Sequence, residues 1–127
     1  MSGAADSTPD IASTAPRVRE VVNAALDRKA EDLKVLHVGE VSGFTEYFMI
    51  CSATNERQVQ AIVDAMVEKL RPHKIRPLGV EGYNRGHWVL MDFGSFIAHV
   101  FDRETRSFYA LEDLWADGVD VTATFVS

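Results

Sequence analysis

The segment W-V-L-M-D-F-G-S-F-I-A-H-V-F, residues 88–101, constrains the fold of this chain more than any other. Gly94 and Ser95 are typical of a two-residue turn between two strands of alternating side chains. This turn predicts the pairs Phe93–Phe96, Met91–Ala98, Val89–Val100, Trp88–Phe101, Leu90–His99 and Asp92–Ile97. One face of the hairpin is then wholly apolar, whereas the other mixes a tryptophan, an aspartate and a histidine with apolar residues. Neither face is plainly hydrophilic, so the second face needs an explanation.

Three interpretations of that second face are open on the residues alone. It is a second buried layer under a helix, with Asp92 and His99 satisfied by hydrogen bonds, or those two residues form an acid–base pair, or the face docks a partner. The catalytic interpretation lacks a Ser, a Cys or a further carboxylate tied to the pair by a motif. A tryptophan, a phenylalanine and a few polar groups are typical of a binding hot spot.

Hydrophobic periodicity and capping signals predict the other elements. Pro16 suits the first turn of a helix, and its apolar stripe is Val18, Val21, Val22, Ala25 and Leu26. Strands are expected over residues 33–38, 46–53 (central, because it is almost continuously apolar) and 75–80 (an edge). Asn55 and Gln58 have the spacing of a capping box before a helix that ends at Pro72, and a short helix is expected over residues 104–115.

Composition sets the limits of the domain. Its 127 residues suit one folded unit, here residues 15–116, between a disordered tail of residues 1–14 and an acidic C-terminal tail of residues 117–127. The single Cys51 is expected to be a buried hydrophobe in a reducing compartment. The four histidines lack metal-ligand spacing, so no metal is expected. No apolar run approaches the ~20 residues of a membrane span, and the N-terminus is unlike a signal peptide, which favours a cytoplasmic protein.

The charge balance indicates the kind of partner. A net charge of −6 disfavours non-specific binding to nucleic acid and favours a basic partner. Positive charge is concentrated locally in Lys69, Arg71, His73, Lys74 and Arg76. A run of this kind at a helix end is interpreted as a solvated surface, where Lys69 and Arg71 also suit the helix dipole.

One enzymatic alternative concerns Gly94-Ser95 followed by Asp102 and Glu104. This order resembles nucleotidyltransferases, in which a Gly-Ser precedes two carboxylates that share one face of a strand and hold Mg²⁺. The gap between the Gly-Ser and the first acid is shorter here than in that family, and Arg103 stands where an apolar residue belongs. Despite these two differences, a small nucleotidyltransferase that uses Asp102 and Glu104 is kept as the alternative function.

Five motifs in this chain resemble one known family, the ribosomal silencing factors, or Iojap-related proteins. They are E-Y-F-M-I-C-S-A-T-N-E-R-Q-V from Glu46, P-L-G-V-E-G from Pro77, W-V-L-M-D-F-G from Trp88, H-V-F from His99 and R-S-F-Y-A-L-E-D-L-W from Arg106. The resemblance runs from about residue 16 to Trp115. Ser95 is a departure, since Asp commonly follows the hairpin glycine in the family.

The resemblance implies an α/β fold, a single mixed β-sheet flanked by helices, with a nucleotidyltransferase-like architecture that lacks the catalytic carboxylates. It implies a translational repressor with no enzymatic activity and no cofactor. The family binds the large ribosomal subunit at its fourteenth protein, blocks small-subunit joining when nutrients are short, and in some cases forms homodimers. No membrane and no sequence-specific nucleic acid is an expected partner.

The resemblance also suggests which residues dock on the partner. They would be Trp88, Asp92, His99 and Phe101 of the hairpin, with Tyr109 and Glu112 of the last helix. From residue 101 onward the chain carries six acidic and two basic residues. Their repulsion from RNA is expected to help keep the small subunit away.

Overall fold

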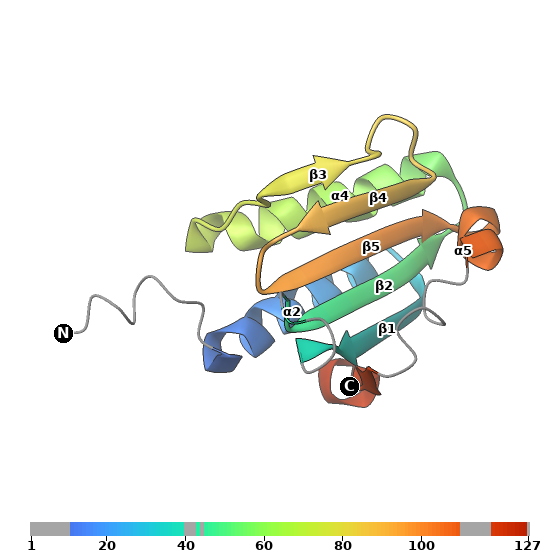
Figure 1. Ribbon diagram of the computed structural model, residues 1–127. Coiled ribbons are helices and arrows are strands. Elements are labelled where there is room, and N and C mark those ends of the chain that lie inside the picture. Colours follow the sequence, from blue (N-terminus) through green and yellow to red (C-terminus); the bar gives the residue numbers. More distant parts are fainter. Residues whose placement is uncertain (1–10, 40–42, 44, 110–117, 127) are drawn as a thin grey trace.

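The structure, a computed structural model, describes residues 11–39, 43, 45–109 and 118–126, and a sheet runs through this described part of the chain (Figure 1). Its six strands are β1 (Glu31–His37), β2 (Tyr47–Ala53), β3 (Gly79–Glu81), β4 (Trp88–Asp92), β5 (Phe96–Asp102) and β6 (Val119–Asp120). Their order is β3-β4-β5-β2-β1-β6. Strands β2 and β5 are parallel, and the other neighbours are antiparallel. This mixed sheet with its flanking helices confirms the expected α/β fold class.

The hairpin of β4 and β5 has the predicted register. Trp88 pairs with Phe101, Leu90 with His99 and Asp92 with Ile97. On the other face, Val89 pairs with Val100 and Met91 with Ala98, as predicted. The Phe93 amide donates to the Phe96 carbonyl over 3.0 Å, and Gly94 has a φ of +85°, a conformation that favours glycine. The turn therefore determines which side chains share the face of Trp88.

Strand β2 is central, as its continuous apolar run predicted. It lies between β5 and β1, and all but its first residue are buried. Cys51 is among them, and burial raises the pKa of its thiol to about 12. The thiol is therefore protonated at neutral pH, as expected for a structural cysteine.

Helix α4 (Glu56–Leu70) begins at the predicted cap. The Asn55 carboxamide oxygen accepts from the Gln58 amide over 2.8 Å. The reciprocal bond of a capping box is displaced by one residue, because the Gln58 side-chain oxygen accepts from the Thr54 amide rather than from that of Asn55. The Gln58 side-chain nitrogen also donates to the carbonyls of Arg28 and Lys29, and these bonds tie α4 to the end of the preceding helix.

Helix α2 (Ile11–Asp27) begins earlier than Pro16 predicted. Residues 11–14, which composition assigned to a disordered tail, are helical, and Pro16 lies inside the helix. Thr14 is buried and Ala15 packs against the core, so tertiary contacts offset the backbone hydrogen bond that proline cannot make. Leu26, expected in the apolar stripe, is 37% exposed, and Ala24 is buried instead.

The two long helices cover one face of the sheet (Figure 1). The main core lies between them and the sheet, and its largest members include Val21, Met49, Ile62, Met66 and Met91. A smaller cluster lies on the opposite face, where Trp88 and Leu90 pack against Leu36, Val38, Phe48, Ile50, Ile97 and Phe101.

The last described segment is part of the folded unit rather than an acidic tail. Strand β6 pairs with β1, and α7 (Thr122–Phe125) follows it. Phe125 is only 3% exposed and belongs to the main core. The segment extends the sheet and the core beyond the expected boundary at residue 116, because one buried aromatic residue in a polar sequence gives little periodic signal.

Two short helices complete the fold. The 3₁₀ turn η1 (Arg71–His73) extends α4 past Pro72, and α5 (Arg103–Tyr109) follows β5 directly. Arg106 of α5 is 9% exposed, and its guanidinium donates to the Ser52 hydroxyl of β2 over 2.9 Å. That bond holds α5 against the end of the central strands.

Candidate functional site

Trp88 is the first residue of β4, and it lies half-buried on the face opposite the long helices. Its indole N–H donates to Nδ1 of His99 over 3.1 Å. Its ring stacks on Phe101, with centroids 5.0 Å apart and planes 27° apart. One hydrogen bond and one stacked neighbour therefore fix the orientation of a large side chain that is still partly accessible.

His99 lies beneath Trp88 and is 4% exposed. Because Nδ1 accepts the indole proton, the neutral ring carries its own proton on Nε2, and that buried atom has no hydrogen-bond partner among the described residues. Burial lowers the pKa of His99 to about 4. The ring is therefore neutral at pH 7 and acts as an acceptor for Trp88.

The acid–base interpretation of Asp92 and His99 does not fit these contacts. Asp92 Oδ1 accepts from the Gly94 amide over 2.8 Å and so caps the hairpin turn. His99 is hydrogen-bonded to Trp88 instead, and a buried imidazole with a pKa of about 4 is a poor general base at neutral pH.

The face of Trp88 is divided between a buried part and a half-exposed part. Phe101 is fully buried and His99 almost so, as the interpretation of a second apolar layer expected. Trp88, Leu90 and Asp92, all on β4, are half-buried. Of the other two residues suggested for docking, Tyr109 ends α5 with its side chain outside the described residues, and Glu112 lies outside them altogether.

A cleft of about 540 Å³ adjoins Trp88. Its lining is Gly82, Arg85, His87, Trp88, Asp102, Glu104 and Thr105. His87 Nδ1 is 2.6 Å from Asp102 Oδ2, and its Nε2 is 3.6 Å from Glu56 Oε1. The hydrogen bond with Asp102 raises the pKa of His87, and Glu56 adds to this rise. Sequence reasoning missed this contact, because no local spacing joins residues 87 and 102.

Asp102 and Glu104 do not form the carboxylate pair of a nucleotidyltransferase. Strand β5 ends at Asp102 and α5 begins at Arg103, so Glu104 is in a helix rather than on the same strand face. Asp102 is already bonded to His87 and accepts from the Thr105 amide over 2.7 Å. Burial alone would raise the pKa of Asp102, but these bonds outweigh it and lower the pKa.

Arg103, between the two acids, makes a bidentate ion pair of 2.6 Å with Glu31. No group of three or more His, Cys, Asp or Glu side chains in the described ranges could hold a metal ion. No helix in those ranges is long and apolar enough to cross a bilayer.

Gly82 gives a physical reason for part of the P-L-G-V-E-G motif. It has a φ of +84°, and a Cβ atom there would lie 2.1 Å from the Trp88 carbonyl oxygen. Only glycine lets the loop after β3 approach the backbone of Trp88 so closely. Gly82 is visible in the motif, but the sequence does not show that it approaches the backbone of Trp88.

Comparison with known proteins shows which family the chain resembles. Residues 11–126 match the family described as "Ribosomal silencing factor during starvation". The protein named Ribosomal silencing factor RsfS from Halalkalibacterium halodurans is 38% identical over 100 residues, which are 79% of this chain and 86% of the relative. The protein of the same name from Bacillus subtilis is 37% identical over 91 residues, 72% of this chain and 77% of the relative. A crystal structure of a Chromobacterium violaceum protein matches with a TM-score of 0.77 and 27% identity, over 80% of this chain and 84% of that one.

Proposed function

The chain belongs to the ribosomal silencing factor family, and from this premise we propose that it represses translation by binding the large ribosomal subunit at its fourteenth protein. The bound protein sterically blocks joining of the small subunit. Family membership makes the chain a ribosome-associated regulator of translation. The observation that supports the finer proposal is the half-buried Trp88, whose ring is partly accessible and is oriented by His99 and Phe101.

The proposed docking surface has two layers with different roles. Trp88, Leu90 and Asp92 of β4 form the outer layer and contact the partner. His99 and Phe101 are too deeply buried to supply much contact area, so they act by orienting Trp88. Tyr109, the last residue of α5, and Glu112, which follows that helix in the sequence, belong to the same proposed surface. A preoriented aromatic side chain loses little conformational freedom on binding, which favours affinity.

The charge of the molecule suits a basic ribosomal protein as partner. The net charge is −6, and Asp102 and Glu104 line the cleft beside Trp88, together with one arginine, Arg85. Opposite charge steers two proteins together and disfavours wrong partners. The proposed mode of action is steric, without turnover of a substrate, and the proposed location is the cytoplasm. Association of two copies away from the ribosome is part of the same proposal.

Sedimentation of purified subunits tests the proposal. The protein should co-sediment with large subunits and, when added before small subunits, lower the fraction of joined ribosomes. Trp88→Ala should weaken binding to the large subunit roughly thirtyfold, the loss of about 2 kcal/mol typical of a central aromatic contact. Val119→Ala, at a position 61% exposed on β6, is the control and should bind as wild type.

A thermal melt of each variant separates docking from folding. Trp88→Phe keeps an aromatic ring above Phe101 and should stay folded while it binds more weakly than wild type. A folded Trp88 variant that binds normally would exclude Trp88 as a docking residue. Normal subunit joining at saturating bound protein would contradict the steric mechanism.

A further inference from the structure

We propose that a basic groove at the C-terminal end of α4 binds the phosphate backbone of RNA, as a second contact with the ribosome. This inference rests on the proposed function for its setting, although its chemistry comes from the groove itself. The groove has a volume of about 780 Å³, and its lining is Val67, Arg71, Lys74, Ile75, Arg76 and Pro77.

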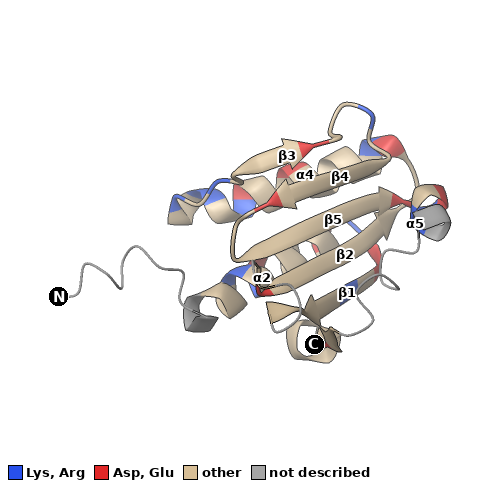
Figure 2. Ribbon diagram, viewed as in Figure 1, with Lys and Arg blue, Asp and Glu red and all other residues tan. Residues whose placement is uncertain are grey.

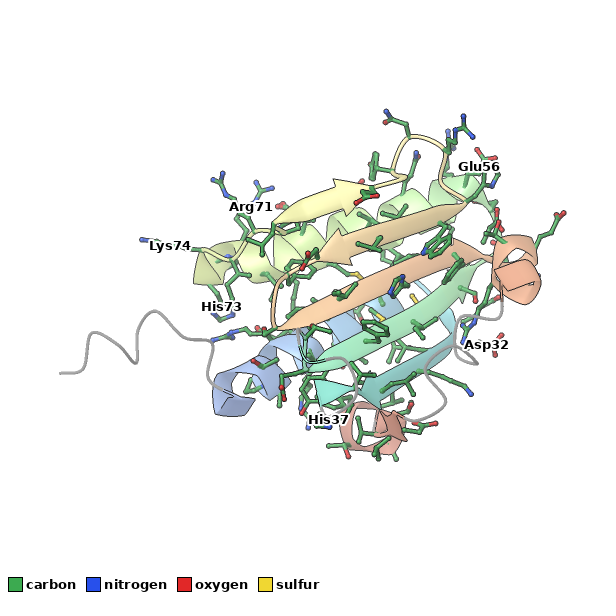
Figure 3. All side chains as sticks on the ribbon, viewed as in Figure 1. Asp32, His37, Glu56, Arg71, His73 and Lys74 are labelled. Carbon is green, nitrogen blue, oxygen red and sulfur yellow. The ribbon has the colours of Figure 1, made fainter. Side chains whose placement is uncertain are left out.

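The local fold turns the cations of this segment outward. Helix α4 ends at Leu70, and η1 reverses the chain, with Lys74 in the left-handed conformation at a φ of +61°. Figure 3 shows Arg71 and Lys74 projecting from this end of α4, and Glu56 lies at the other end. Basic residues gather at the same end of the ribbon in Figure 2. A protein of net charge −6 thus presents a local positive surface.

The cations of the groove are not neutralised by neighbouring acids. Lys74 and Arg76 form no ion pair with any carboxylate in the part of the chain that the structure describes. Arg71 is 3.3 Å from Glu68, but the two side chains are 69% and 59% exposed, and such pairs are weak. His73, by contrast, is paired with Glu20 over 2.8 Å and takes no part in the groove.

The chemistry of the lining favours a phosphate backbone over base recognition or an acidic protein. Two guanidinium groups and one ammonium group can bind phosphate oxygens, and arginine does so with two parallel hydrogen bonds. Val67, Ile75 and Pro77 provide an apolar floor, and the three cations are the only polar side chains among the described residues of the lining. The major groove of an A-form RNA duplex is too narrow for side chains to enter, so these cations would meet phosphates rather than guanine edges. Binding should therefore be independent of sequence. RNA is also the anionic polymer that surrounds a protein docked on a ribosomal subunit.

The groove and Trp88 are far enough apart to act as two separate contacts. His87, next to Trp88, lies beside Glu56 at the first turn of α4, whereas the groove begins at Val67 in its last turn. A helix of 15 residues is ~22 Å long. Two contacts on one rigid body reinforce each other, because the second forms within the complex that the first has made. They also fix the orientation of the protein on the subunit.

The test is the salt dependence of binding to two probes, purified large subunits and a 20-base-pair RNA duplex. The groove variant is Arg71→Gln/Lys74→Gln/Arg76→Gln. The control variant, Arg28→Gln/Lys29→Gln/Arg57→Gln, has the same net charge and changes three exposed cations elsewhere. Three phosphate contacts predict that the slope of log K against log salt is smaller by about 2 to 3 in the groove variant. Affinity for large subunits should then fall roughly 20- to 40-fold more in wild type than in the groove variant between 50 and 200 mM salt.

The outcomes separate this inference from the proposed function. If wild type and the groove variant have equal salt slopes on both probes, the groove does not bind RNA. That result would leave the proposed docking through Trp88 intact. Failure of wild type to bind subunits, with groove-dependent binding to the duplex, would overturn the proposed function and leave the groove. A groove variant that loses subunit affinity without any difference on the duplex would assign the groove to an acidic protein instead.

Discussion

At the scale of single residues, the unusual feature is a histidine used as a buried acceptor. His99 holds the indole of Trp88, yet its own Nε2–H has no acceptor among the described residues. A buried donor without a partner costs about 1–3 kcal/mol, so the position is not optimised for stability alone. The arrangement is consistent with a residue whose role is to orient Trp88.

The burial of His99 predicts a loss of stability in acid. The pKa of His99 is about 4 in the folded protein and about 6.5 when unfolded, so between these values only the unfolded chain takes up a proton. The free energy of unfolding should therefore fall by about 3 kcal/mol as the pH drops from 6.5 to 4. Urea unfolding across this range measures the change. In His99→Gln, which keeps an acceptor for Trp88, this contribution should be absent.

His87 provides the opposite control. Its pKa is raised by Asp102, so its contribution to stability is present below the unfolded pKa and is lost as the pH rises through the raised value. His87→Gln should therefore alter the pH dependence on the neutral to alkaline side and leave the acid loss in place. A wild-type profile identical to that of His99→Gln between pH 4 and 6.5 would contradict the assignment to His99.

At the scale of elements, the sequence predicted correctly those features that depend on interactions between residues close together in the chain. The register of β4 and β5 follows from a two-residue turn and strict alternation, and α4 follows from Asn55 and its apolar stripe. The start of α2 at Ile11 was missed, because Thr14 and Ala15 pack into the core and the local signal of Pro16 does not reveal this. The contact of His87 with Asp102 was missed for the same reason, since it joins a loop to a strand end.

The candidate site was predictable only in part. Alternation placed Trp88, His99 and Phe101 on one face, and the structure agrees. Alternation does not say how deeply a side chain lies, so it could not show that Phe101 is buried while Trp88 is half-exposed. Depth depends on the whole packing of the molecule rather than on the strand.

Replacing Gly82, in the loop after β3, by alanine should lower the stability of the protein strongly, because the added methyl group has no room. In Gly82→Ala the new Cβ would lie 2.1 Å from the Trp88 carbonyl oxygen, and the backbone would have to move. We expect a loss on the order of 3 kcal/mol in urea unfolding, together with weaker binding to large subunits. Gly43→Ala is the matched control, because it also has a positive φ, +74°, but its Cβ would meet no atom within 4 Å. It should cost only the ~1–2 kcal/mol of a left-handed alanine. Equal losses in the two variants would rule out the steric effect at Gly82.

At the scale of the whole molecule, the C-terminal segment completes both the sheet and the core. Thr122 Oγ1 accepts from the Val35 amide over 2.9 Å, and the Val121 amide donates to the Val35 carbonyl over 2.9 Å. Phe125 meets Tyr47 edge-to-face with ring centroids 5.6 Å apart, and the Arg19 guanidinium lies 5.5 Å above its ring. A segment that composition assigned to a tail thus joins the first strand, the central strand and α2.

Phe125→Ala tests this role of the C-terminal segment. Removal of a buried phenylalanine should lower the free energy of unfolding by about 3–5 kcal/mol, measured by urea unfolding. Thr124→Ala, at an exposed position in the same short helix, should change it little. If Phe125→Ala is as stable as Thr124→Ala, the segment is not part of the core in solution.

The order of the strands has a consequence for how the newly synthesised chain folds. The central pair joins Tyr47 to Phe96, and the far edge joins Leu36 to Asp120, so the sheet depends on partners separated by much of the chain. Topologies of such high contact order fold slowly, and synthesis delivers the N-terminus first, at ~5–20 residues per second. The sheet can close only when its last strand has been made. We therefore expect the nascent chain to complete this sheet only after residue 120 has left the ribosomal exit, well after its first strand has emerged.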